Sequence, residues 1–206
     1  MPRRRPYTAV ERHRTVEAGR ERILAAARDL LADMDADTFS IDAVAQRAGV
    51  ARMTIYNQFE SKAGLLEALF DSLAENGPFR EMGEIFEEPD PLVALDRYVA
   101  IFGRFWTVHR VAHRRLRAAA LHDADLASAI EARNERRRKG ITELLRRLGD
   151  TAKPVVSRSD TIETVYLMLS FTTFDALAGE NRTPEDIVPT MRRLIRAILG
   201  LRVTGR

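Results

Sequence analysis

The side chains with the most specific chemistry gather in one short stretch, residues 49–62, which reads GVARMTIYNQFESK. It holds arginine, threonine, tyrosine, asparagine and lysine groups, all of which donate or accept hydrogen bonds. It contains no cysteine or histidine. The chemistry that these residue types offer is recognition of a polar partner by hydrogen bonds.

Two other groupings could in principle bind a metal or catalyse a reaction. His109 and His113 stand four residues apart, a spacing that suits zinc on a helix, but arginines surround them and no acid or cysteine is near. His122, Asp123 and Asp125 are better explained as a loop or a helix cap. The sequence contains no glycine-rich phosphate loop, nucleophile elbow or HExxH motif. We therefore expect no enzyme, no metal and no cofactor.

Two short helices must position the 49–62 stretch. Ser40 is placed to cap a helix over 41–48, and Gly49 to end it in the left-handed conformation. A second helix over 52–58 turns Ile55 and Phe59 inward. Its outward face then carries Arg52, Met53, Thr54, Tyr56 and Asn57. This is the geometry of a helix-turn-helix, in which the second helix faces outward.

The rest of the chain also reads as helical, because apolar residues recur at helical spacing and no segment alternates as a strand does. Asp90-Pro91 opens a helix to 108, and Asp160 with Glu163 resembles a capping box. Gly140 indicates either close packing or a bend, and the arginine-rich run 133–139 indicates a solvated face. The other predicted helices cover 17–34, 110–121, 124–148, 160–178 and 184–200. One more carries an apolar stripe from Leu65 to Leu73 and is stopped by Gly77-Pro78.

Composition limits the class of protein. The 206 residues include no cysteine, no apolar run of membrane-spanning length and no secretory leader, so we expect a cytoplasmic protein without a membrane partner. The net charge of +3 is mild. Residues 1–22, however, carry seven arginines against three glutamates. Such an arm suits a phosphate backbone, although a solubilising tail has the same composition.

The stretch GVARMTIYNQFESKAGLLEAL resembles the signature of the tetracycline-repressor (TetR) family, approximately G-V-S-x-x-T-(I/L)-Y-x-H-F-x-S-K-x-x-L. The specific likeness covers about residues 20–70. Ala51, Gln58 and Glu60 depart from the pattern. The resemblance implies an all-α protein with a basic arm (1–16), a three-helix helix-turn-helix domain (17–76) and a helical ligand-binding and dimerisation domain (77–206). It also implies a ligand-responsive transcriptional regulator, most often a repressor, that binds a palindromic operator in double-stranded DNA as a homodimer.

The resemblance assigns roles within the helix-turn-helix that the chemistry of the side chains supports. Tyr56 and Lys62 would hold phosphates, and Ser40 could do the same at the start of its helix. Arg52, Met53 and Asn57 would face base edges, while Thr54 either caps, packs or contacts DNA.

The remaining expectations concern the second domain. Its last two helices would form the dimer interface, although the same residues could be ordinary core: Ile162, Tyr166, Leu169, Met191, Leu194 and Ile198. An aromatic stripe would line a cavity for a small, largely apolar effector, or again be ordinary core: Tyr98, Phe102, Trp106 and His109, with Phe171 and Phe174 opposite. The alternative is a DNA-binding protein of the same family that is constitutive or controlled by a protein partner.

Overall fold

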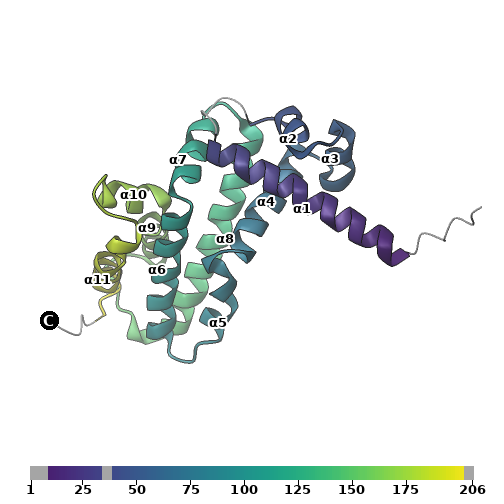
Figure 1. Cartoon of the computed structure of the whole chain (residues 1–206). Coiled ribbons are helices and arrows are strands. Elements are labelled where there is room, and N and C mark those ends of the chain that lie inside the picture. Colours follow the sequence, from purple (N-terminus) through teal and green to yellow (C-terminus); the bar gives the residue numbers. More distant parts are fainter. Residues whose placement is uncertain (1–8, 34–38, 202–206) are drawn as a thin grey trace, which may run out of the picture. The chain divides into compact units, whose positions relative to one another are not determined.

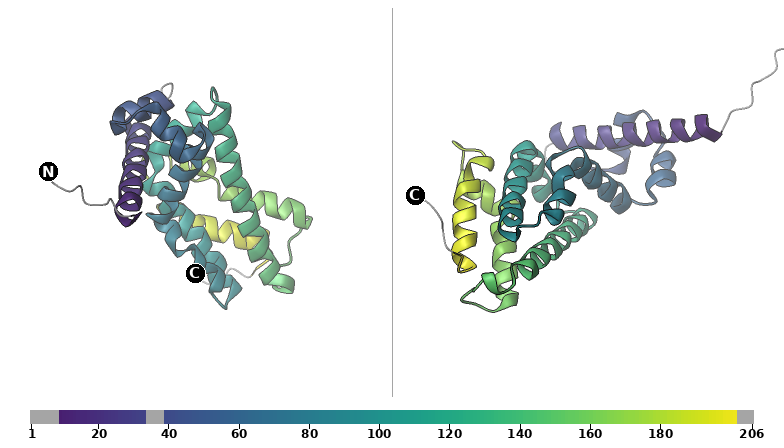
Figure 2. Two further views of the ribbon diagram at one scale, coloured as in Figure 1. Left: turned by 90° about the vertical axis from the view of Figure 1, so that its right-hand side faces the viewer. Right: turned by 90° about the horizontal axis from the view of Figure 1, so that it is seen from below.

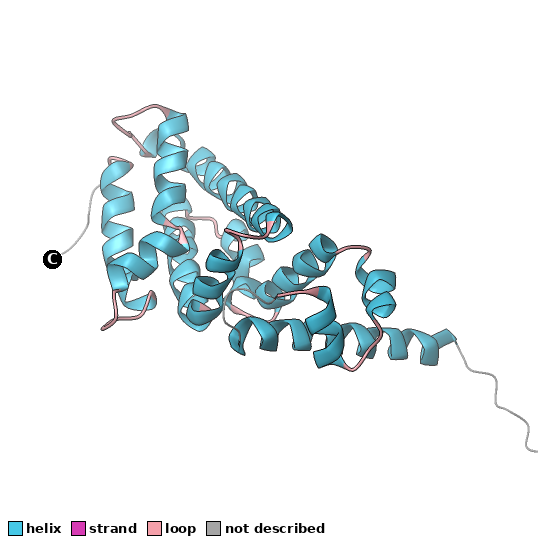
Figure 3. Cartoon of the chain, turned by 90° about the horizontal axis from the view of Figure 1, so that it is seen from above, coloured by secondary structure: helices cyan, strands magenta, loops and turns pink. Residues whose placement is uncertain are grey.

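The computed structural model of the chain describes residues 9–33 and 39–201. Within these residues every regular element is a helix, as Figure 3 shows, so the all-α prediction is confirmed. No helix in the described part is long and apolar enough to cross a membrane. The chain divides into two compact units, of which the first takes the described residues up to Ser72 together with Arg115–Ala127, and the second takes the others.

The first unit is built on the opening helices (Figure 1). These are α1 (Ala9–Asp33), α2 (Ile41–Ala48), α3 (Arg52–Phe59) and the first turns of α4 (Lys62–Glu75). Helix α1 packs on α2, and α2 on α3. Their shared core includes Ile23, Val44, Ile55, Leu65 and Leu69, all fully buried. The apolar stripes of the sequence therefore do form the core of this unit.

The second unit is centred on α6 (Pro91–Val108), which contacts several other helices. Its other elements are η1 (Pro78–Glu81), α5 (Met82–Glu87), most of α8 (Ala124–Leu148), η2 (Gly149–Thr151), α9 (Arg158–Met168), α10 (Phe171–Ala178), η3 (Glu185–Ile187) and α11 (Val188–Ile198). Helix α7 (Arg110–Ala119) begins in this unit and ends in the first. Helix α9 packs on both α10 and α11, and η3 contacts α10 and α11 as well; these elements are the light green to yellow ones in Figure 2.

Several predicted boundaries are confirmed by the structure. Helices α6 and α8 begin and end where the sequence indicates. The side chain of Asp90 caps α6 by accepting a hydrogen bond from the Leu92 amide at 2.8 Å. Gly140 marks close packing rather than a bend, because a Cβ there would lie 2.4 Å from the Tyr98 hydroxyl oxygen.

Other predicted boundaries are wrong. The first helix begins at Ala9 rather than near residue 17, so part of the predicted basic arm is helical, and residues 1–8 of that arm lie outside the described part. The predicted helix 160–178 is two helices, α9 and α10. Ser170 accepts a hydrogen bond from the Thr173 amide and so begins a new helix at this point. The cap of α9 is Ser157, which accepts from the Asp160 amide, and not Asp160 itself.

Candidate nucleic-acid interface

The turn between α2 and α3 is held by local signals that the sequence displays. The Ser40 hydroxyl accepts a hydrogen bond from the Ala43 amide at 3.1 Å and so begins α2. Gly49 ends it in the left-handed conformation, with φ at 65°, and the Val50 amide bonds back to the Ala45 carbonyl. Ala51 takes the N-cap position of α3 without any side-chain bond. The predicted helix-turn-helix backbone, with its missing cap, is confirmed.

Helix α3 separates an inward from an outward face. Ile55 and Phe59 are buried, whereas Met53 is 64% exposed. Asn57 is exposed as well. Thr54 and Tyr56 are partly exposed at the edges of the same face. This face therefore combines an apolar side chain that can contact a thymine methyl with side chains that can hydrogen-bond base edges.

Arg52 is fixed in place by two neighbours. Its guanidinium donates to both carboxylate oxygens of Asp42 at 3.1 and 3.2 Å and to the Tyr56 hydroxyl at 3.2 Å. The hydrogen bond to Tyr56 and the charge of Asp42 raise the pKa of Arg52. Sequence reasoning missed Asp42, which lies in the first turn of α2, ten residues before Arg52. The three side chains form one polar group that spans the two helices.

Lys62 does not extend freely into solvent. Its ammonium donates to the Asp123 carboxylate, and the two side chains are only 22% and 20% exposed. Asp123 also accepts from the Leu126 amide at 3.2 Å and so caps the start of α8. Burial acts to raise the pKa of Asp123, but the bonds from Lys62 and the backbone outweigh it and lower the pKa. The predicted phosphate-binding lysine therefore already carries a carboxylate partner, which lies 61 residues away in the sequence.

The segment around Phe59 is tightly constrained, which fixes where Lys62 begins α4. Glu60 has a φ of 65°, and the Ser61 amide bonds to the Phe59 carbonyl at 2.7 Å. The Ser61 hydroxyl then caps α4 through the Gly64 amide at 3.0 Å. Position 64 must be glycine, because a Cβ there would lie 2.1 Å from the Phe59 carbonyl oxygen. Sequence reasoning assigned Ser61 only to the family pattern and missed this cap.

In the second unit, the predicted effector residues do come together. Tyr98, Phe102, Trp106, Phe171 and Phe174 are all buried in one core. The Trp106 ring lies 5.8 Å from that of Phe102 and 5.6 Å from that of Phe171, and its indole N–H donates to the Leu169 carbonyl. The sixth predicted residue, His109, is partly exposed and packs on Phe105. The described residues contain no group of three side chains that could hold a metal ion.

Arg137 belongs to this aromatic core, although the sequence places it in a run that indicates a solvated face. It is only 8% exposed. Its guanidinium carbon lies 4.5 Å from the Tyr166 ring centroid and 5.8 Å from that of Phe102. The prediction of a wholly solvated face is thus wrong at this position. The sequence does contain a signal that position 137 is buried, because it shares one helical face with three apolar residues, Ile141, Leu144 and Leu148.

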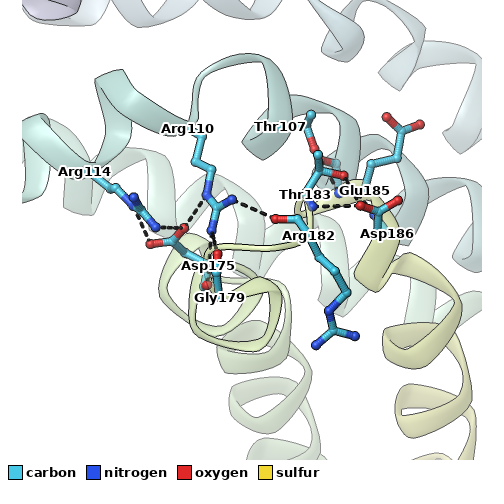
Figure 4. A network of polar contacts seen from close by, with 10 residues as sticks. Thr107, Arg110, Arg114, Asp175, Gly179, Arg182, Thr183, Glu185 and Asp186 are labelled. Carbon is cyan, nitrogen blue, oxygen red and sulfur yellow. Dashed lines mark hydrogen bonds and ion pairs between the residues drawn. The ribbon is translucent and has the colours of Figure 1, made fainter.

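Helix α7 is tied to α10 by a second group of charges that sequence reasoning missed (Figure 4). The Asp175 carboxylate accepts from Arg110 at 2.6 Å and from Arg114 at 2.8 and 2.9 Å. Arg110 also donates to the carbonyls of Gly179 and Arg182, so one guanidinium closes the turn after α10. Burial acts to raise the pKa of Asp175, but the two arginines outweigh it and lower the pKa.

The predicted dimer residues differ in exposure within the single chain. Leu169 and Met191 are fully buried, and Tyr166 is buried beside Arg137. Ile162 and Ile198 are partly exposed. Leu194 is 45% exposed, and it is accompanied by Leu167 at 59% and Leu177 at 40%, which sequence reasoning did not select. The exposed apolar side chains thus come from α9, α10 and α11.

Comparison with known proteins agrees with this geometry. Residues 23–69 match the family of bacterial regulatory proteins named after tetR. A stretch of 61 residues is 41% identical to the HTH-type transcriptional regulator AlkX of Mycobacterium tuberculosis; it covers 28% of this chain and only 29% of that protein.

Solved structures share the fold over nearly the whole chain. NalD, the secondary repressor of the MexAB-OprM multidrug efflux pump in Pseudomonas aeruginosa, has a TM-score of 0.68 at 19% identity and covers 93% of this chain and 100% of its own. A putative TetR-family regulator from Syntrophomonas wolfei has a TM-score of 0.69 at 16% identity, covering 92% and 99%. PfmR from Thermus thermophilus has a TM-score of 0.60 at 21% identity, covering 90% and 100%. At such identities the likeness establishes the fold alone.

Proposed function

We propose that this chain is a cytoplasmic, ligand-responsive repressor that binds a palindromic operator as a homodimer. It belongs to the tetR family of bacterial regulatory proteins, which are regulators rather than enzymes. The observation that carries the proposal is the outward face of α3, where exposed Met53 and Asn57 adjoin an arginine fixed by neighbouring side chains. Helix α3 would enter the major groove, as second helices of this motif do.

Each side chain of this face has a role that fits its chemistry. Asn57 can pair bidentately with adenine, Arg52 can donate to guanine, and Met53 can contact a thymine methyl. Tyr56 accepts from Arg52, so its own hydroxyl hydrogen remains available for a phosphate oxygen. Ser40, Thr54 and Lys62 are proposed as further contacts to the DNA backbone. For Lys62 this requires that its bond to Asp123 be exchanged for one to phosphate.

The operator would be read by two copies, since one short helix covers only a few base pairs and half-sites lie about one helical turn apart. The proposed interface is made by the exposed apolar side chains of α9, α10 and α11, which are Leu194, Leu167, Leu177, Ile162 and Ile198. The buried Leu169 and Met191 would support that surface from below. A surface of this kind is typical of subunit contacts.

The proposed effector site is the aromatic core around Trp106, where an indole, a phenol and an imidazole accompany apolar rings. A small, largely apolar molecule would bind there and reduce the affinity for DNA. The alternative remains a regulator that is constitutive or controlled by a protein partner. It predicts that no small molecule changes both Trp106 emission and DNA binding over the same range of concentration.

The test is selection of bound sites from random DNA with the purified full chain. We expect an inverted repeat to be enriched, with two half-sites about 34–36 Å apart or a multiple of that distance. Arg52→Ala is expected to bind the enriched site about 1–3 kcal/mol more weakly while it binds scrambled DNA nearly as well as the wild type. Enrichment of no sequence at all would contradict the proposal.

A further inference from the structure

Arg137 is an unusual residue to find in an apolar core. Of the charged side chains in the described part of the chain, it alone is among the buried residues. Burial lowers its pKa, which reflects the cost of keeping the cation away from water. Buried guanidinium groups are normally matched by a carboxylate that accepts two parallel hydrogen bonds.

The hydrogen-bond donors of Arg137 are only partly satisfied. Nη2 donates to the Asn134 side-chain oxygen at 3.1 Å, a neutral acceptor one turn earlier on the same helix. Nε is buried and has no acceptor within the described residues. Three rings surround the guanidinium carbon, those of Tyr166, Phe102 and Trp106, at 4.5, 5.8 and 5.9 Å. The Tyr166 side chain also accepts a hydrogen bond from the guanidinium, which acts to raise the pKa of Arg137, but among the described residues Nε itself has no acceptor.

The nearest acids are engaged elsewhere. Glu131 and Glu163 both accept from Arg138, the next residue, at 2.8 and 3.1 Å. Both glutamates are more than half exposed, on the outer side of α8 and α9. Among the described residues, Arg137 therefore has no carboxylate of its own.

The surroundings keep the guanidinium in this position. The Tyr98 hydroxyl donates to the backbone carbonyl of Arg137 at 3.3 Å, and the absence of a side chain at Gly140 is what lets Tyr98 reach it. Asn134 is partly exposed, so the Nη2 edge of the group adjoins the surface of α8. An incoming acceptor could replace Asn134 on Nη2 and engage the unused Nε–H beside it.

We propose that Arg137 is an anion-binding residue of the second unit, and that the effector is an amphiphilic carboxylate whose charged end pairs with Arg137 while its apolar body lies among the rings of Phe102, Trp106 and Phe171. The proposal rests on the ligand response proposed above and narrows its chemistry. It adds a negatively charged end to the small, largely apolar effector proposed above.

The test compares each carboxylate with its amide, which has almost the same shape but no charge. Octanoate and phenylacetate are titrated against octanamide and phenylacetamide at constant ionic strength. Binding is followed by the emission of Trp106, the only tryptophan in the chain, and by the melting temperature. The variant is Arg137→Met, since an apolar residue of similar length is tolerated in place of a buried cation. The control is Arg146→Met, an exposed arginine of the same helix that pairs with Glu143.

We expect at least one of the carboxylates to bind the wild type and Arg146→Met more tightly than its amide, and to bind Arg137→Met about 10- to 100-fold more weakly, the range of a charge-assisted hydrogen bond. If Arg137→Met does not fold, Arg137→Lys keeps the charge and loses the planar fork, and a weakened carboxylate affinity is then the expected result. The proposal is overturned if neither carboxylate binds better than its amide, or if binding is the same without Arg137.

DNA binding is measured separately, so the two proposals can fail independently. Carboxylate binding that depends on Arg137 but leaves operator affinity unchanged would preserve the anion site and refute its role as the effector site. Release of the operator by the amides as well as by the carboxylates, with equal effect on Arg137→Met, would preserve the ligand response and refute the anion site.

Discussion

Neutralising Asp123 is expected to strengthen DNA binding. In the free chain the Lys62 ammonium is paired with the Asp123 carboxylate, so it can bind a phosphate only after that bond breaks. Asp123→Asn removes the charge but keeps the side-chain oxygen that caps α8 through the Leu126 amide. The variant therefore releases Lys62 without removing the cap.

The size of the effect follows from the burial of the pair. Both side chains are about four-fifths buried, so their interaction lies between that of an exposed ion pair and that of a buried charged hydrogen bond. We take it as about 1–2 kcal/mol, which corresponds to a gain in affinity of roughly 5- to 30-fold at low salt. Because Lys62 is proposed to contact a phosphate in both proteins once DNA is bound, the dependence of log K on log salt is expected to stay about the same.

The assay is fluorescence anisotropy of a labelled operator duplex and of a scrambled duplex, each over a series of salt concentrations. Because a phosphate contact carries no sequence information, both duplexes are expected to gain by the same factor. Asp125→Asn is the matched control, since it removes one negative charge from the exposed first turn of the same helix. Equal affinity of the two variants for DNA would refute the reasoning, as would a gain that persists when Lys62→Ala is added to Asp123→Asn.

Four further predictions concern the fold. Ala51→Ser is expected to raise the free energy of unfolding by about 0.5–1 kcal/mol in urea titration, since the N-cap backbone is already extended and lacks a side-chain bond; a loss would show that the turn excludes the cap. Gly140→Ala is expected to lower it by about 1–3 kcal/mol, because the new Cβ would collide with Tyr98; an unchanged value would contradict the close packing. Asp175→Asn is expected to lower the free energy of unfolding by about 1–3 kcal/mol at neutral pH, because it removes the charge that pairs with Arg110 and Arg114. Since the pKa of Asp175 is lowered in the folded chain, this difference is present above its unfolded pKa of about 3.9 and disappears as the pH falls through the folded value; a pH-independent difference would refute the ion-pair origin. Leu194→Glu is expected to give a folded monomer by light scattering and circular dichroism, because the position is 45% exposed in one chain, whereas a dimer of unchanged mass would place the interface elsewhere.

The parts of the fold that the sequence predicts well are those encoded by neighbouring residues. Ser40 and Gly49 mark both ends of α2, and Asp90-Pro91 marks the start of α6. The break between α9 and α10 was harder to predict, because the apolar residues around Leu169 continue on both sides of it. Ser170 is the capping residue, and within an apolar run one serine is indistinguishable from an interior helix residue until its bond to Thr173 is seen.

In the candidate site, too, some features could be predicted from neighbouring residues and others could not. The outward face of α3 follows from helical spacing alone, so the exposure of Met53 and Asn57 was predictable. The partners of the cations were not, because they depend on tertiary contacts. Asp42 is ten residues from Arg52, and Asp123 is 61 residues from Lys62. No periodicity within one helix contains that information.

The ion pairs of Arg52 with Asp42 and of Lys62 with Asp123 limit how strongly these cations can attract a phosphate. A cation that is already paired gains less from a phosphate than a free one does, because the bond to its own carboxylate must be given up. Arg52 and Lys62 are both in this position. In the proposed DNA complex, this pairing would reduce what both residues contribute to binding arbitrary DNA. The spare N–H groups of Arg52 would still be able to bond a base edge without breaking the bond to Asp42. The paired state would thus favour sequence-dependent contacts over indiscriminate ones, which is the balance that the proposed operator binding requires.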